Sequence, residues 1–176
     1  MSSFIQGPHF PELMIDIETL STRYDAAIIS IAAVRFNITT KQYARPFFYE
    51  EIDHESLTNF HVNPKTIKWW EQQDKTPPNG STKIQSALVK LIDFINEHPP
   101  TRVWAKSPSF DINRLEYACD HFDLEWPIPF WKGRDVRTAM DMGNIPNNFT
   151  ATHNAVEDCF SQIRSVIESF DNILLK

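Results

Sequence analysis

Residues 13–19 read LMIDIET, an apolar run that is interrupted by two acids, Asp16 and Glu18. Apolar and β-branched residues favour a buried strand, in which residues two apart project from the same face. The two carboxylates then lie about 7 Å apart along the strand and repel each other unless a cation lies between them. The stretch therefore predicts either a metal site or the acidic, solvated face of an edge strand.

Two further segments place acids at the starts of predicted helices. Asp111 follows Phe110, and Asp158 lies five residues after His153. Each acid also has a structural interpretation, because the helix dipole favours carboxylates in the first turn, and a histidine at such a position is commonly a cap or a surface residue. Four separately placed acids with one histidine nevertheless favour a shared site, since Mg²⁺ and Mn²⁺ prefer oxygen ligands.

The apolar pattern predicts strands first and then strands alternating with helices. Three strands joined by short connections, typical of an antiparallel meander, are expected over residues 13–17, 27–36 and 43–50. A later strand is expected over 102–105, a strand or extended segment over 128–136, and helices over 64–73, 84–95, 108–122 and from Asn154 onward. We therefore expect one α/β domain over residues 1–176, a mixed sheet of three antiparallel and then parallel strands flanked by helices.

Composition excludes some classes of protein. With 176 residues, of which 41% are hydrophobic, the chain can bury a sizeable core. The formal charge of −6 argues against a surface that coats nucleic acid, but it allows a pocket for a strand end. No apolar run is long enough for a membrane helix and residues 1–8 lack a signal-peptide pattern, so we expect a cytoplasmic protein without membrane contact. Cys119 and Cys159 are expected to be reduced core residues.

These motifs together resemble the DEDDh 3'-5' exonucleases, whose ribonuclease-H-like fold also houses the proofreading exonucleases of DNA polymerases. The strand with Asp16 and Glu18, the pair Phe110-Asp111 and the motif His153-x4-Asp158 come in the order of that family. Further segments are similar to a phage and prophage subgroup that includes the T4-type exonuclease A, the exonuclease VIII-like proteins and related bacterial exoribonucleases. They read TIKWW at 66–70, FWxxRDVRT at 130–138 and HNA at 153–155.

The resemblance implies a metal-dependent 3'-5' exonuclease that releases nucleoside 5'-monophosphates from single-stranded 3' ends of DNA or RNA, in phage or the bacterial host cytosol. Asp16, Glu18, Asp111 and Asp158 would hold two Mg²⁺ or Mn²⁺ ions, and His153 would act as the general base. Two alternatives keep the same fold: a catalytically silent nucleic-acid-binding or assembly module, and a proofreading subunit of a polymerase complex.

Substrate contacts are also implied. Thr19 and Leu20 would lie beside the terminal nucleotide, and Phe110 would either stack on a base or pack in the core. Trp69 and Trp70 diverge by about 100° on a helix, so one is expected to face the core and the other the substrate.

Two arginines and the oligomeric state leave alternatives open. Arg134 and Arg137 either hold phosphates or, in the interpretation that we prefer, form ion pairs with Asp135 or neighbouring acids. The aromatic content offers enough apolar surface for a homodimer interface.

Overall fold

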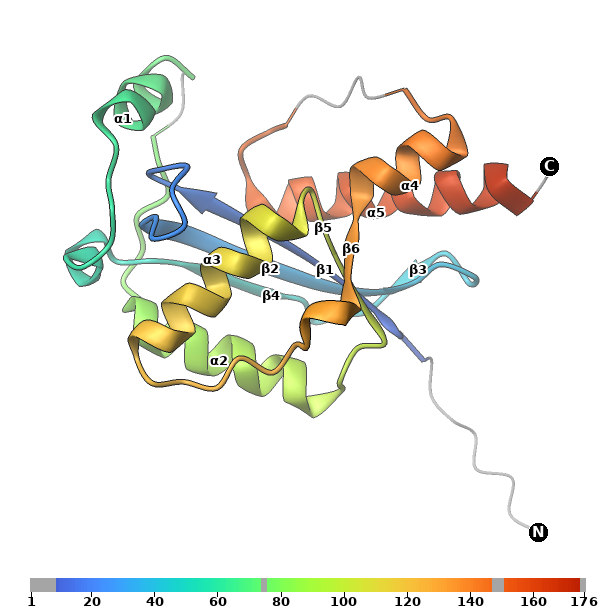
Figure 1. The fold of residues 1–176 in the computed structure, drawn as a ribbon, viewed down its shortest axis with the longest axis horizontal. Helices are drawn as coiled ribbons and strands as arrows, with labels where there is room; N and C mark the ends of the chain where they lie inside the picture. Colours follow the sequence, from blue (N-terminus) through green and yellow to red (C-terminus); the bar gives the residue numbers. More distant parts are fainter. Residues whose placement is uncertain (1–8, 74–75, 147–150, 175–176) are drawn as a thin grey trace, which may run out of the picture.

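A mixed six-stranded sheet forms the centre of the computed structural model, which describes residues 9–73, 76–146 and 151–174 (Figure 1). The strands are β1 (Glu12–Thr19), β2 (Ile28–Asn37), β3 (Gln42–Tyr43), β4 (Phe48–Glu51), β5 (Arg102–Ala105) and β6 (Gly133–Asp135). Their order is β3-β2-β1-β5-β6, and β4 also pairs with β2. The first four strands pair antiparallel, whereas β5 and β6 are parallel to β1. The predicted fold class is confirmed.

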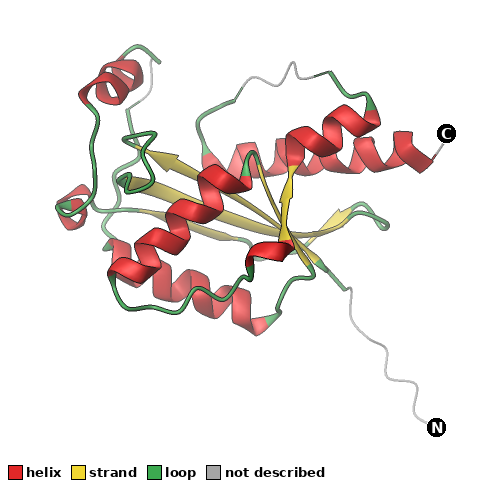
Figure 2. Cartoon of the chain, viewed as in Figure 1, coloured by secondary structure: helices red, strands yellow, loops and turns green. Residues whose placement is uncertain are grey.

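Helices cover both faces of this sheet (Figure 2). The α-helices are α1 (Pro64–Glu71), α2 (Ile84–Glu97), α3 (Pro108–His121), α4 (Val136–Gly143) and α5 (Ala155–Leu174), with short 3-10 helices η1 (His54–Leu57) and η2 (Phe130–Lys132). In the described part of the chain, no helix is both long and apolar enough to cross a membrane.

Strand β1 is an inner strand of the sheet and its Asp16 and Glu18 are half-buried, so the interpretation of these acids as the solvated face of an exposed edge strand is wrong. Ile15 and Ile17 pack in the core on the side of α2 and α3, whereas Met14 packs with α4 and α5. Because side chains alternate along a strand, both acids share the face of Met14. The sheet therefore points its two carboxylates toward α5.

Two predicted strands differ in the structure. The strand expected over 43–50 is divided into β3 and β4, because Pro46 between them has no N–H to donate to the ladder. The segment over 128–136 holds η2 and the three-residue β6, and it is followed by α4, which the pattern did not predict. The carboxylate of Asp135 starts α4 by accepting hydrogen bonds from the N–H groups of Arg137 and Thr138.

Both cysteines are free and buried, as expected. The Sγ atom of Cys159 lies 3.9 Å from the carbonyl oxygen of Met14 and 3.8 Å from that of Ala32, so the first half of α5 rests directly on β1 and β2. This contact fixes the distance between α5 and the face of β1 that carries Asp16 and Glu18.

Candidate active site

A cavity of about 480 Å³ opens where β1, α3 and α5 meet. The five residues predicted to carry the chemistry all line it, although they come from three distant parts of the chain. The lining residues are Asp16, Ile17, Glu18, Lys106, Phe110, Asp111, Arg137, Ala151, His153, Asp158 and Gln162.

The start of α5 positions His153 and Asp158. The Asn154 side chain accepts hydrogen bonds from the N–H groups of Val156 and Glu157, which confirms the predicted helix cap. The carboxylate of Asp158 accepts one bond from the N–H of His153, at 3.1 Å, and others from Thr152. His153 has a φ angle of 54°, a left-handed conformation that a residue other than glycine rarely adopts and that often marks a functional site.

Asp111 is bound to β1 at the part of that strand's edge that β5 leaves unpaired. Strand β5 pairs with β1 only as far as Met14. The N–H of Ile17, which lies beyond this pairing, donates instead to Oδ1 of Asp111 at 3.2 Å. The first turn of α3 thus delivers a third carboxylate beside those of Asp16 and Glu18.

The acids repel one another in a buried setting. Burial raises the pKa of Asp16 well above its usual value, and the negative charges of Asp111, Glu18 and Asp158 raise it further. Burial also raises the pKa of Asp111 to about 7, against the opposing effect of the Ile17 N–H. Such a cluster is costly unless a cation compensates it.

The donor atoms are close enough to share a cation. Glu18, His153 and Asp158 each offer one ligand atom, and the three atoms lie within 4.8 Å of one another. Asp16 and Asp111 border the same cavity. Oxygen-rich donor sets of this kind suit hard divalent ions.

One functional candidate, Gln162, was missed. It is buried on α5, one helical turn after Asp158, and its Nε2 donates to Oδ1 of Asp16 at 2.6 Å. The spacing of four residues from Asp158 places both side chains on one face of the helix, a signal that was present in the sequence.

Two cations, Lys106 and Arg137, also line the cavity. Burial and the nearby charge of Arg137 lower the pKa of Lys106. The preferred interpretation of Arg134 and Arg137 as ion-pair partners is wrong, since among the described residues neither pairs with an acid and Asp135 caps α4 instead. The guanidinium of Arg137 therefore stays available to the cavity.

The tryptophan pair is divided as expected. Trp70 is buried and donates from Nε1 to the carbonyl of Thr19, whereas Trp69 is 37% exposed. Both rings meet that of His153 edge to face, with centroids 4.6 Å away for Trp69 and 5.9 Å for Trp70. Trp69 is therefore the member of the pair that borders the site.

The three predicted substrate residues are placed differently. Phe110 lines the cavity and also packs against the core, with the Arg114 guanidinium 3.5 Å from its ring centroid. Thr19 and Leu20 are buried and do not line the cavity. Contact between these two residues and a nucleotide stays a prediction.

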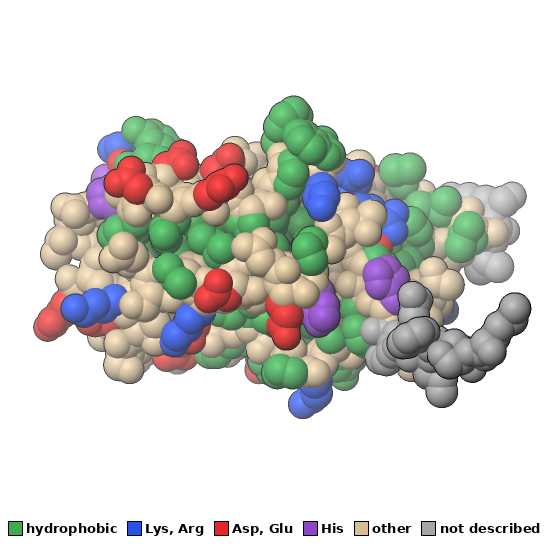
Figure 3. All heavy atoms as spheres, turned by 90° about the horizontal axis from the view of Figure 1, so that it is seen from below, with side chains coloured by type: hydrophobic (Ala, Val, Ile, Leu, Met, Phe, Trp, Pro, Cys, Tyr) green, Lys and Arg blue, Asp and Glu red, His purple; other side chains and the backbone are tan. Residues whose placement is uncertain are grey.

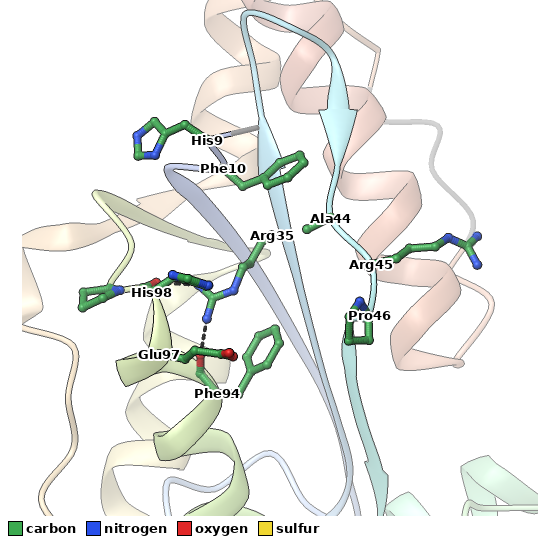
Figure 4. A pocket seen from close by; sticks show the side chains of 10 residues that line it. His9, Phe10, Arg35, Ala44, Arg45, Pro46, Phe94, Glu97 and His98 are labelled. Atoms are coloured by element: carbon green, nitrogen blue, oxygen red, sulfur yellow. Dashed lines mark hydrogen bonds between the residues drawn. The ribbon is translucent and has the colours of Figure 1, made fainter. Parts of the chain in front are cut away.

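A second cavity, of about 550 Å³, lies at the opposite end of β1 and contains none of these acids (Figure 4). Its central charge, Arg35, is buried and donates hydrogen bonds to the carbonyls of Phe94 and His98. These carbonyls belong to the last turn of α2, so Arg35 caps that helix. The structure accounts for this arginine without a ligand.

A mixed sheet with paired acids on its central strand, and a histidine and an acid at the start of the last helix, is the arrangement that the resemblance to the DEDDh exonucleases implies. Solved structures agree on the fold. The nuclease domain of 3'hExo, a DEDDh family member bound to rAMP, superimposes with a TM-score of 0.61 at 14% identity, covering 93% of this chain and 94% of that one. A 3'-exonuclease solved for its 3'-end-specific recognition of a histone mRNA stem-loop gives 0.62 at 16% identity, covering 94% and 84%.

The chain belongs to the family of the Rv2179c-like 3'-5' exoribonuclease domain, whose model matches residues 11–170. It is thus a 3'-5' exonuclease by family. A curated relative, an exodeoxyribonuclease of Enterobacteria phage T4, is 26% identical over an alignment of 196 positions that covers 86% of each protein.

Proposed function

We propose that the protein removes nucleoside 5'-monophosphates one at a time from single-stranded 3' ends, as one domain over residues 1–176 acting in the cytoplasm. The observation that carries the proposal is the convergence of Glu18, His153 and Asp158, with ligand atoms within 4.8 Å of one another, beside the buried carboxylate of Asp16. Bringing these carboxylates together lowers the stability of the fold, which is typical of a site that serves a charged reaction centre.

Asp16, Glu18, Asp111 and Asp158 are the residues that would hold Mg²⁺ or Mn²⁺. Two such ions would stabilise charge on the attacking and the leaving oxygen of the phosphodiester. The raised pKa values of Asp16 and Asp111 support this role, because burial disfavours the ionised form of both carboxylates even though Arg114 and Arg137 lower the pKa of Asp111 in part, and a divalent ion would add further positive charge.

His153 would take the proton from the attacking water. Its backbone N–H is tied to Asp158, while its ring lies at the cavity between the Trp69 and Trp70 rings and the acids. The aromatic contacts limit the positions of the imidazole, which supports a base with a fixed direction of approach. Lys106 and Arg137 border the same cavity and would bind the phosphate oxygens.

A direct assay tests the proposal. Matched 5'-labelled DNA and RNA oligonucleotides, single- and double-stranded, are incubated with wild-type protein and Mn²⁺, and the products are resolved on a gel. We expect ladders that shorten from the 3' end and release of 5'-monophosphates. The same gels establish whether the protein prefers RNA or DNA. The comparisons differ on this point, since the family is described as an exoribonuclease domain and the phage relative is an exodeoxyribonuclease.

Two variants separate chemistry from metal binding. We expect Asp16→Ala to abolish cleavage and to weaken Mn²⁺ binding in calorimetry. His153→Ala should reduce cleavage by about 100-fold or more, because a general base contributes about 10²- to 10⁴-fold, while Mn²⁺ binding is retained by the four carboxylates, to which we assign the ions. Undiminished cleavage by purified Asp16→Ala protein would contradict the site, and wild-type protein that binds no Mn²⁺ would indicate a silent module.

A further inference from the structure

Two highly exposed aromatic side chains, Phe130 and Trp131, lie next to each other on η2. Phe130 is 88% exposed and Trp131 is 63% exposed, and their rings meet edge to face with centroids 5.2 Å apart. Single exposed apolar residues are common, but two adjacent large rings in solvent mark an interaction surface more often than not. Neither ring is used by the active site described above.

Two arginines connect this aromatic pair to the catalytic cavity. Arg134 donates from Nη1 to the carbonyls of Trp131 and Gly133, each at 2.8 Å, which fixes a positive charge on the turn that carries the rings. Arg137 follows one turn later and borders the cavity. We name Phe130, Trp131, Arg134 and Arg137 the 130–137 ridge.

The positive charge of the ridge discriminates between two kinds of binding partner, a second copy of the chain and a polyanion. Neither arginine forms an ion pair within the described ranges, although the chain as a whole has a net charge of −6. A second copy in a symmetric contact would bring the same arginines and the same net charge to the interface, so like charges would face each other. A polyanion meets no such repulsion at this surface.

We propose that the 130–137 ridge binds the single-stranded nucleic acid that leads into the cavity, on the 5' side of the scissile phosphate. This inference rests on the proposed function. Exposed rings stack on bases of any sequence, and arginines follow the phosphates. The 3-10 helix η2 rises about 2 Å per residue and the strand β6 about 3.3 Å, so the ridge spans less than about 20 Å, which is room for at most about five stacked nucleotides at about 3.4 Å each.

The surface agrees with such a track. Figure 3, which views the molecule from the side of α2 and η2, shows hydrophobic side chains that stand out from the surface beside a group of Lys and Arg side chains. The same β6 segment leads from η2 to α4, so the chain itself connects the exposed rings to the rim of the cavity. The ridge is thus continuous with the site along the chain, and its last member, Arg137, lines the cavity.

The test compares a long with a short substrate. Steady-state kinetics with Mn²⁺ are measured on a 12-nucleotide strand and on a dinucleotide for wild-type, Trp131→Ala and Trp131→Phe proteins. We expect Trp131→Ala to raise KM for the 12-mer between about 5- and 150-fold, the range for one stacked base, with kcat and the dinucleotide KM unchanged. Trp131→Phe should retain most of the affinity, because a ring remains.

Binding is also measured without catalysis. Fluorescence anisotropy of a labelled 12-mer in EDTA should show the same loss for Trp131→Ala, and Arg134→Gln should lower the slope of log Kd against log salt by about 0.7. Leu174→Ala is the matched control, since this residue is 81% exposed at the end of α5 and outside the ridge. Its affinity should equal that of the wild type.

Three results would contradict nucleic-acid binding by the 130–137 ridge. The first is an equal effect of Trp131→Ala on both substrate lengths, and the second is no effect on either. The third is a lower molar mass of Trp131→Ala than of wild type by light scattering, which would show that the rings hold a second copy. Ridge-dependent binding in EDTA by a wild-type protein that does not cleave with Mn²⁺ would instead remove the proposed function and leave the ridge in place.

Discussion

Gln162 illustrates how one neutral side chain can hold a catalytic carboxylate. Its Nε2 donates to Asp16 at 2.6 Å, while its Oε1 is buried with no hydrogen-bond partner. A flipped amide would turn Oε1 toward the carboxylate oxygen, where two acceptors repel, so the ionised form of Asp16 fixes the amide in one orientation. Gln162 is therefore suited to position Asp16 for metal binding.

We expect Gln162→Leu to weaken Mn²⁺ binding by about 10- to 100-fold, the usual cost of losing a group that orients a metal ligand. Leucine has a similar volume but cannot donate to Asp16. The measurement is isothermal titration with Mn²⁺. Gln85→Leu, on the exposed side of α2, is the control and should leave the affinity unchanged. Equal affinities for Gln162→Leu and wild type would show that Asp16 needs no such support.

Single residues also show what the sequence could predict. Asp16 and Glu18 were placed on one face by the alternation of β1 alone, and Asn154 was recognised as a helix cap by its residue type. The charge pattern favours an ion pair of Arg134 or Arg137 with Asp135 or a neighbouring acid, because a short-range pattern does not show that the Asp135 carboxylate is already used as a cap. Convergence of the acids at a shared site is favoured by their residue types and by the resemblance, but no local rule predicts their geometry, since tertiary contacts bring them together.

Between elements, α4 approaches α5 closely at the point where α4 ends. A Cβ atom built on Gly143 would lie 2.5 Å from Cα of Ser169, and Nδ2 of Asn172 donates to the Gly143 carbonyl at 2.9 Å. The missing side chain thus lets the two helices touch backbone to backbone. The pattern did not predict α4, because eight residues are few for a periodic signal and its start depends on the Asp135 cap.

We expect Gly143→Ala to lower the free energy of unfolding by about 1 to 3 kcal/mol, because the added methyl group forces the two helices apart. The midpoint of urea unfolding, followed by circular dichroism, measures the change. Gly133→Ala is the control: its Cβ would meet its nearest neighbours at 3.5 Å, an ordinary contact, so a change within about 0.5 kcal/mol is expected. Equal stability of the two variants would contradict the close packing of α4 on α5.

For the whole molecule, the acidic cluster links stability to divalent ions. The elements that carry the acids are held by the core on both faces of the sheet, so the carboxylates cannot separate without unfolding. The metal-free fold must therefore accept their repulsion or take up protons. An ion that binds only the folded state raises the free energy of unfolding as its concentration rises above Kd.

The raised pKa of Asp111 determines the direction in which the stability of the metal-free protein changes with pH. Its value is 3.8 as a free carboxyl and about 7 in the fold, because it is buried. Below about pH 4 the carboxyl is protonated in both states and costs nothing. As the pH rises toward 7, the unfolded state ionises first, so the folded state loses stability, and the loss reaches roughly 2 to 4 kcal/mol above pH 7.

We therefore expect Asp111→Asn to be more stable than wild type in EDTA at pH 8, by roughly 2 to 4 kcal/mol, and equal to it near pH 4. Asparagine keeps an oxygen for the Ile17 N–H and carries no charge. Saturating Mn²⁺ should reverse the order at pH 8, because the ion stabilises the wild type more. Urea midpoints at the two pH values, with and without Mn²⁺, measure this, and Asp120→Asn, on the exposed side of α3, should follow the wild type throughout. An Asp111→Asn protein that is no more stable than wild type at pH 8 in EDTA would show that the buried carboxylate is compensated without a metal ion.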